Sequence, residues 1–265
     1  MLHVASLGSG SGGNSTVIRT DNTTLLLDCG FTLKETTARL SLLGLHPADI
    51  DAVLISHEHG DHVKGVGPLS RKFATPIWLT HGTYSSLRDN RFHKIQIIDA
   101  HSSWQIGDIE INPFPTPHDA AESCQYIFTH DEVRFACVTD LGACTPHVIS
   151  TLEGINSLIV ETNYDNVMLA NGPYPYSLQQ RIKSNYGHLG NDQGADLVKH
   201  LDHAGLQHIL LGHISEQNNS DQVAYDTMKN RLDDGHERIH VLAQHKPSAW
   251  FAVGAKVSSE VAEPA

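Results

Sequence analysis

The sequence predicts one domain of mixed α and β layers, on three observations. Short apolar segments of strand length dominate the first half, and a strand–helix–strand unit follows late in the chain. The 265 residues, 40% of them hydrophobic, suffice for one substantial core. No long linker or low-complexity tract divides the chain. We therefore expect a single domain over residues 1–253 and a disordered polar tail over residues 254–265.

The expected elements follow from apolar periodicity and turn residues. Residues 1–30 should form strands around a Gly/Ser loop, with a buried strand at 25–30, and residues 34–43 a helix that Gly44 closes. Further elements are then expected in chain order: strands 51–56 and 76–80, a hairpin over 104–114, a hairpin of 126–130 with 133–139, a strand at 157–161, a helix at 193–203, and strands at 208–211, 241–243 and 250–253.

Composition limits the classes of function. The chain has 18 Lys and Arg against 30 Asp and Glu, a formal charge of −12, which argues against a broad nonspecific nucleic-acid surface but leaves nucleic acid open as a substrate. No apolar run approaches the roughly 20 residues of a membrane span, and the first residues lack a signal-peptide pattern. We expect a cytoplasmic protein with neither a membrane partner nor an organic cofactor, in which four cysteines without CxxC spacing are buried, reduced thiols: Cys29, Cys124, Cys137 and Cys144.

The densest chemical signal directly follows the predicted strand 51–56. It reads His57-Glu58-His59-Gly60-Asp61-His62, three imidazoles and one carboxylate among six residues. On a turn, His57 and His59 can converge on one metal, and Gly60 would supply the backbone freedom for that turn. Asp61 and His62 would then point at a neighbouring position. The cluster predicts a metal site, with two metals rather than one.

Three more candidates each follow a short apolar strand: His118, Asp140 and His213. Alone, each is an ordinary residue at a strand end. Together with the loop they supply five His and two Asp, enough for two ions with three protein ligands each and one bridging carboxylate. Nitrogen and carboxylate donors without thiolate suit zinc, manganese or iron, and we expect two divalent ions, Zn²⁺ or Mn²⁺.

The motif HxHxDH, followed by His, Asp and His in this order, resembles the metallo-β-lactamase fold superfamily from about residue 1 to about residue 253. The resemblance implies an α+β fold, a four-layer αββα sandwich with the metals at one edge between its two sheets. Asp140 stands where true β-lactamases carry a metal-binding cysteine, which disfavours lactam hydrolysis. The resemblance also implies the ligand sets: His57, His59 and His118 for one metal, Asp61, His62 and His213 for the other, and Asp140 as the bridge.

A second pair, Glu161 and His188, is similar to a pair in tRNase Z, in which a Glu orients a His that protonates the leaving oxygen. With Asp61, these are the expected catalytic residues. A closer resemblance is to the YycJ/WalJ-like group of bacterial nucleases, which is associated with 5′→3′ exonuclease activity on DNA. It rests on five segments: Gly8–Ser15, Glu161–Asp165, Gly172–Pro175, Gly187–Asn191 and His213–Asn219.

Plainer interpretations stand beside several of these assignments. The GxGxxG spacing at 8–13 precedes strand-like residues instead of a helix, so we expect a hairpin turn or a backbone nest for a substrate phosphate, not a dinucleotide site. His188 could be an ordinary surface residue and Glu161 a structural carboxylate; only the pair supports an acid and its orienting partner.

Asp28 is expected to orient a metal-binding imidazole rather than to bind metal. His200, His203 and His208 should face water and hold no third metal. The substrate-binding candidates are two residues of the Gly/Ser loop and two bases ahead of His188, although exposed bases are common: Ser11, Asn14, Arg181 and Lys183.

The expected function is a dinuclear metal-dependent phosphodiesterase, namely a 5′→3′ DNA exonuclease in DNA repair or metabolism. Two alternatives remain open. One is a small-molecule phosphodiesterase for cyclic nucleotide-like substrates, and the other is a non-hydrolytic metal-binding or redox-sensing protein. Labelled single-stranded DNA separates the first two, and the third predicts no hydrolysis at all. Nothing in the sequence indicates an oligomeric state.

Overall fold

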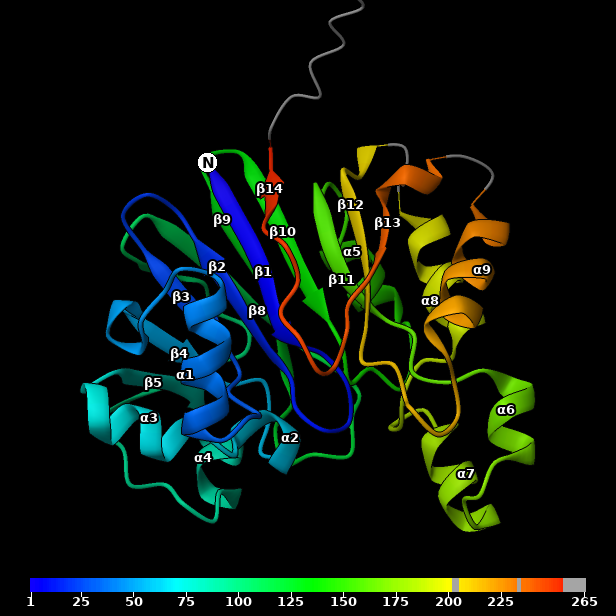
Figure 1. The fold of residues 1–265 in the computed structure, drawn as a ribbon, viewed down its shortest axis with the longest axis horizontal. Coiled ribbons are helices and arrows are strands. Elements are labelled where there is room, and N and C mark those ends of the chain that lie inside the picture. Colours follow the sequence, from blue (N-terminus) through cyan, green and yellow to red (C-terminus); the bar gives the residue numbers. More distant parts are fainter. Residues whose placement is uncertain (202–204, 233–234, 255–265) are drawn as a thin grey trace, which may run out of the picture.

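The computed structural model describes residues 1–254 except 202–204 and 233–234. In this part of the chain two seven-stranded sheets face each other (Figure 1). The first sheet contains, in spatial order, β14 (Phe251–Val253), β1 (Leu2–Gly8), β2 (Ser15–Arg19), β3 (Thr24–Leu27), β4 (Ala52–Leu54), β5 (Pro76–Thr80) and β6 (Lys94–Ile98). The second contains β13 (Ile239–Val241), β12 (His208–Gly212), β11 (Ser157–Glu161), β10 (Val133–Val138), β9 (Cys124–His130), β8 (Ile109–Pro115) and β7 (Trp104–Ile106).

Helices cover the outer face of each sheet, so the predicted αββα sandwich is confirmed (Figure 1). The first sheet carries α1 (Leu33–Leu42), α3 (Val66–Phe73) and α4 (His81–Ser86), and the second α5 (Pro146–Thr151), α8 (Asn191–His200) and α9 (Asp221–Arg231). Short helices lie at the lower edge in Figure 1: α2 (Gly60–Val63), α6 (Asn166–Asn171) and α7 (Tyr176–Ile182). Two 3₁₀ turns complete the described elements, at Pro47–Asp49 and His236–Arg238.

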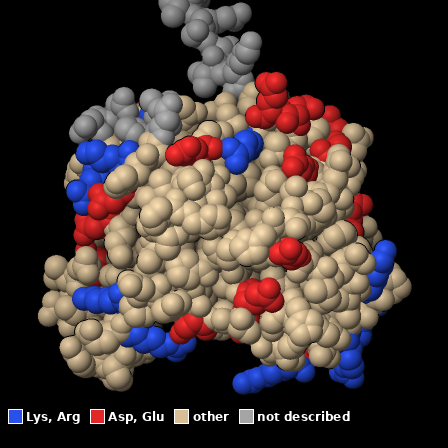
Figure 2. Space-filling model, turned by 180° about the vertical axis from the view of Figure 1, so that it is seen from behind, with Lys and Arg blue, Asp and Glu red and all other residues tan. Residues whose placement is uncertain are grey.

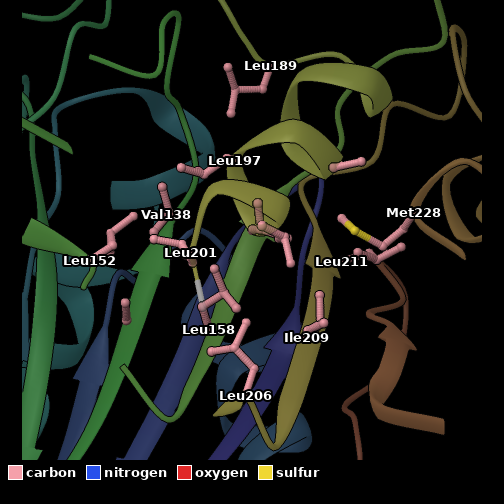
Figure 3. Packing of buried hydrophobic residues seen from close by; sticks show 14 of the residues in the cluster. Val138, Leu152, Leu158, Leu189, Leu197, Leu201, Leu206, Ile209, Leu211 and Met228 are labelled. Atoms are coloured by element: carbon pink, nitrogen blue, oxygen red, sulfur yellow. The ribbon is translucent and has the colours of Figure 1, made fainter. Parts of the chain in front are cut away.

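The alternation of side chains along each strand builds two kinds of core. In β10, Phe135 and Cys137 pack between the sheets, whereas Ala136 and Val138 pack under the helices. Figure 3 shows this outer cluster, in which Val138 lies with side chains of α8 such as Leu197. Strands that are buried on both faces, such as β3, β11 and β12, are apolar almost throughout, and this makes them recognisable in the sequence.

The direction of the strands determines where functional side chains can gather. Strands β3 to β6 run parallel to one another, and so do β10 to β13. The carboxyl ends of parallel strands meet at one edge of a sheet, where α/β proteins bind ligands. The segments after β3, β4, β10 and β12 therefore converge at the lower edge in Figure 1.

Most predicted strands are present within a few residues of their expected bounds, and both hairpins are confirmed. The strand expected at 241–243 is instead β13 at Ile239–Val241, and the helix expected at 193–203 begins at Asn191 and ends at His200. Except for Gly254, the predicted disordered tail lies outside the described residues, as do residues 202 and 203 of the expected helix. The unpredicted elements include β6, α3, α5, α6, α7 and α9.

The turn between β7 and β8 ties the two sheets together through Asp108. Its Oδ1 accepts hydrogen bonds from the hydroxyls of Thr20 (2.7 Å) and Thr23 (2.6 Å), and its Oδ2 accepts one from the Asn22 amide (3.2 Å). Burial alone would raise the pKa of Asp108, but the hydrogen bonds from Thr23, Thr20 and Asn22 lower it from 3.8 to about 2. These charge-assisted bonds exist only while the carboxylate is ionised.

We expect Asp108→Ala to lower the free energy of unfolding by about 1–2 kcal/mol at pH 7, measured by urea denaturation. The folded-state pKa lies below the unfolded one, so this contribution is present above about pH 4 and is lost as the pH falls toward about 2. The difference between wild type and variant should shrink over that interval. Asp21, exposed near this contact, provides the control Asp21→Ala. A pH-independent difference would contradict the proposed contribution of ionised Asp108.

Candidate metal centre

Three residues at the strand ends hold a backbone conformation that usually belongs to glycine. The φ angles are +57° at Asp28, +54° at Asp140 and +54° at His213, which follow β3, β10 and β12. A side chain in this left-handed region costs conformational energy, and such residues cluster at functional sites. Each of the three side chains contacts another buried ionisable group, as described below. The left-handed backbone conformation positions the side chains for these contacts.

The first donor group consists of His57, His59 and His118, whose ligand atoms lie within 4.8 Å of one another. Nδ1 of His59 is 3.3 Å from Nε2 of His118. The rings of His57 and His118 are 4.9 Å apart, centre to centre. His57 and His118 are buried, whereas His59 is half-buried and faces the pocket described below.

The second group consists of Asp61, His62 and His213. Oδ2 of Asp61 is 3.5 Å from Nε2 of His62 and 3.6 Å from Nε2 of His213. Asp140 lies between the two groups: its Oδ2 is 3.3 Å from Nε2 of His62, and its Oδ1 is 3.8 Å from Nε2 of His118. The structure thus brings all seven predicted ligands together, and their division between two ions stays a prediction.

Protein oxygen atoms fix the orientation of four imidazoles. In each ring Nδ1 is held, which leaves Nε2 directed at the centre. Three of these nitrogens donate to acceptors that cannot themselves donate: Nδ1 of His62 to Asp28 (2.8 Å), of His118 to the carbonyl of Gly187 (3.0 Å) and of His213 to Glu161 (2.7 Å). The fourth, Nδ1 of His57, is 3.0 Å from the Ser56 hydroxyl. Asp28 thus has the predicted contact with a candidate ligand and belongs to no donor group itself.

Two polar atoms in this cluster fit a bound cation. Nε2 of His57 and Oδ2 of Asp140 are buried, and neither has a hydrogen-bond partner in the described chain. An unpaired buried polar atom is costly, so native structures rarely leave one without a partner. A divalent ion in contact with both groups would satisfy them. Imidazole and carboxylate donors without thiolate suit such an ion, and the residues present therefore fit divalent metal.

The charges in the cluster are strongly coupled. Burial alone would lower the pKa of His62, but the carboxylates of Asp140, Asp61 and Asp28 raise it well above its usual value. Burial likewise opposes the proton on His213, yet Asp140, Asp61 and Glu161 raise its pKa to about 10. Burial and the neighbouring imidazoles lower the pKa of His57 far below 6.5. A cation that binds His62 and His213 would compete with the protons that these carboxylates favour.

Glu161 joins the donor cluster to His188. Its Oε1 accepts from Nδ1 of His188 (2.8 Å) and from Nδ1 of His213 (2.7 Å). Its Oε2 accepts from the backbone N–H groups of Leu141 and Leu189, both at 3.0 Å. Burial disfavours the carboxylate, but His188 and His213 hold the pKa of Glu161 well below its usual range. The predicted Glu161–His188 contact is present, and the contact with His213 was not predicted.

A pocket of about 250 Å³ opens beside these groups. Its lining includes Asp140, His188 and His213, and also the apolar or aromatic side chains of Tyr174, Leu178 and Ile182. With its Nδ1 held by Glu161, His188 has Nε2 available to a ligand in the pocket. The arrangement places the His188 imidazole next to donors that fit a divalent metal, at a cavity large enough for a small organic group.

The substrate-binding candidates separate into two pairs. Ser11 and Arg181 line the pocket, and Arg181 also forms an ion pair with Asp119 (2.5 Å). Asn14 corrects its prediction, because it is buried behind Asp61 and its amide lies 3.3 Å from the Asp61 carboxylate. Lys183 is the half-buried C-cap residue after α7 and is not among the residues that line this pocket, so its role stays a prediction.

Two smaller expectations were wrong. Gly60 has no positive φ angle, and a Cβ atom there would meet nothing within 4 Å, so the turn does not require glycine. His208 does not face water beside a helix; it lies in β12, half-buried against His240 and Phe251. His200 is exposed as expected. The three cysteines in the strands and loops near the core are buried, and Cys144 is half-buried.

Several pocket residues were missed, notably Tyr174, Leu178 and Asn218. The Gly172–Pro175 segment was recognised in the sequence, but no role was assigned to it. No simple spacing rule connects it to the ligand loop more than one hundred positions earlier. Only the fold brings the two together.

Comparison with known proteins agrees with this geometry. The family model described as Beta-lactamase superfamily domain matches residues 23–214. Exodeoxyribonuclease WalJ of Streptococcus pneumoniae is 34% identical over 232 residues, which cover 85% of this chain and 86% of that protein. Exodeoxyribonuclease YycJ of Bacillus anthracis is 33% identical over 241 residues, covering 88% of this chain and 90% of that protein. Among solved structures, the metallo-β-lactamase fold protein YhfI of Bacillus subtilis has a TM-score of 0.73 at 19% identity, covering 94% of this chain and 100% of that chain, which shows the shared fold.

Proposed function

This chain belongs to the metallo-β-lactamase superfamily, in the family of the exodeoxyribonucleases WalJ and YycJ, and on that premise we propose that it is a metal-dependent nuclease that degrades DNA from the 5′ end. The single observation that carries the proposal is the Glu161–His188 pair beside the metal donors. A proton donor held next to a divalent-metal site is what phosphodiester hydrolysis needs, because the departing oxygen is a strong base.

We propose two divalent ions, zinc or manganese, held by the two donor groups with Asp140 between them. When bound, these ions would lower the pKa of a water nucleophile and draw charge from the phosphoryl oxygens. The protein then supplies orientation and the proton. Glu161 holds Nδ1 of His188 and favours the imidazolium, and Nε2 of His188 donates its proton to the departing oxygen.

The alternatives have less support. A non-hydrolytic sensor would not need a proton donor at the mouth of the pocket. A small-molecule phosphodiesterase would use the same groups, but the relatives that align over 85% and 88% of this chain are exodeoxyribonucleases. Action in the cytoplasm, in DNA repair or metabolism, completes the proposal, and the four cysteines without a disulfide support a reducing compartment.

The purified protein, supplied separately with manganese and zinc, should release mononucleotides from single-stranded DNA when the label is at the 5′ end. DNA labelled at the 3′ end should shorten progressively and keep its label until late. Asp61→Ala should abolish both reactions, because Asp61 is a predicted ligand. Intact DNA alongside rapid cleavage of small phosphodiesters would replace this proposal with a metabolite phosphodiesterase.

A further inference from the structure

Two cavities meet at the metal donors from opposite sides. The pocket described above lies between the donors and α7, and a larger groove lies between the donors and α2, where it reaches Lys64 and Arg88. Ser11, His59 and Asp61 line both. In Figure 1, α7 and α2 accordingly lie on opposite sides of the lower edge. A strand laid across the donors could therefore place one end in each cavity.

The two cavities differ in size and in lining. The pocket beside α7 measures about 250 Å³ and the groove about 730 Å³. The pocket has room for one nucleoside but not for a run of stacked bases. The groove carries the exposed cations Lys64 and Arg88, and in the described chain Arg88 forms no ion pair. Figure 2 shows Lys and Arg side chains at both lower corners of the molecule, although the chain carries −12 overall.

The Gly172–Pro175 segment gives the pocket an aromatic wall. Tyr174 stands between Pro173 and Pro175, and proline restricts both its own backbone and that of the residue before it. The carbonyl of Tyr174 also accepts a hydrogen bond from the Gln179 side chain (2.9 Å). The half-buried Tyr174 ring packs with Leu178 against the small core under α7. Its position is therefore fixed before any ligand arrives.

A polar group at the same pocket lacks a partner. Asn218 is 1% exposed and lines the pocket, and its Oδ1 has no hydrogen-bond partner in the described chain. An aromatic face, apolar side chains and a free amide acceptor together suit a nucleobase, which has a π-face and polar edges.

Resting on the proposed function, we propose that the pocket beside α7 binds the terminal nucleoside of the strand, with its base against Tyr174, and that the remaining strand lies in the groove beside α2. His188 lines the pocket but not the groove, so the departing oxygen belongs to the nucleotide in the pocket. A water oxygen forms a bond to phosphorus and loses a proton to solvent. The bond between phosphorus and the 3′ oxygen breaks, and that oxygen takes the proton of His188. The 5′-terminal nucleotide leaves, and the shortened strand gains a 5′-phosphate.

The test compares two tyrosines two positions apart. Tyr174 lines the pocket, whereas Tyr176 is 74% exposed and does not. Tyr174→Ala should lower kcat/KM for single-stranded DNA about tenfold or more, mainly through KM, because one base loses its stacking partner. Tyr174→Phe should keep most of the activity, and Tyr176→Ala should match wild type. Metal content, measured in parallel, should not change in any of the three.

Substrates that lack one base locate the effect. An abasic 5′-terminal nucleotide should lower kcat/KM for wild type about tenfold, but should have little further effect on Tyr174→Ala, because both changes remove the same contact. Moving the abasic position to the third nucleotide should abolish this coupling. If the 5′-abasic nucleotide and Tyr174→Ala lowered kcat/KM independently, so that their effects multiplied, the inference would be wrong. It would also be wrong if only the loss of the 3′-terminal base lowered kcat/KM. If wild type degrades no DNA at all, the proposed function fails first.

Binding gives a readout apart from turnover. With EDTA present, fluorescence anisotropy of a labelled oligonucleotide should show weaker binding to Tyr174→Ala than to wild type or Tyr176→Ala, and the difference should vanish for the 5′-abasic oligonucleotide. Equal affinity of all three proteins for the intact oligonucleotide would count against a base-binding role for Tyr174.

Discussion

Replacing Asp140 by alanine is expected to remove bound metal and to reduce nuclease activity by more than about 100-fold, the upper range for residues that only orient ligands. Asp140 lies between both donor groups, 3.3 Å from Nε2 of His62 and 3.8 Å from Nε2 of His118. Without its carboxylate both groups lose a negative charge that offsets the ions. Metal content by mass spectrometry and activity on single-stranded DNA should fall together.

Asp131 provides a matched control for that substitution. Its φ angle is also +54°, but its side chain is 84% exposed at the turn between β9 and β10. Asp131→Ala changes the same residue type at the same backbone conformation, so it reports on backbone strain without touching the donors. It should keep metal content and activity. If Asp140→Ala retained both ions, the bridging assignment would be wrong.

The second large effect is expected at His188. His188→Ala should keep its metal and lower kcat on DNA by roughly 10²–10⁴-fold, the range for a lost general acid. The loss should be much smaller for the p-nitrophenyl ester of thymidine 5′-phosphate, because p-nitrophenolate departs without a proton. Both substrates would be assayed with wild type, with His188→Ala and with the control His200→Ala at an exposed site. These assays separate proton donation from substrate positioning. An equal loss on both substrates would indicate that His188 positions the substrate instead.

The pH dependence of the activity on DNA should also reflect His188 as a general acid. Burial acts to lower the pKa of His188, but Glu161 raises it above its usual value. The acid must be protonated to act, so wild-type activity on DNA should persist at neutral pH and decline on the alkaline side of that raised pKa. Activity of His188→Ala should lack this alkaline decline.

The sequence predicts which side chains gather in the donor cluster because their chemistry is local. His57 to His62 stand in one segment, and an apolar strand beside each distant candidate marks it as a strand end. Asn14 and Ser11 show the limit of such reasoning. Both belong to one polar loop, but only the folded hairpin turns Asn14 toward Asp61 and leaves Ser11 facing the pocket.

The pocket wall could not be predicted for a different reason. Helices α6 and α7 have six and seven residues, too few for a clear apolar period, and they cover a cavity rather than the main core. Likewise β6 lies at a sheet edge and has partly exposed residues, so the apolar pattern in its sequence is weak. The contact of Glu161 with His213 joins positions 52 residues apart, which no local pattern reveals.

The two sheets contribute jointly to the metal donors, since His57 and His59 follow β4 whereas His118 follows β8. Bound ions would therefore act as cross-links between the halves of the molecule. By linkage, an ion at one hundred times its Kd stabilises the folded state by about 2.7 kcal/mol. Proteases remove unfolded chains, so the cellular supply of metal would set the abundance of this protein as well as its catalytic rate. Metal starvation would then deplete the enzyme itself.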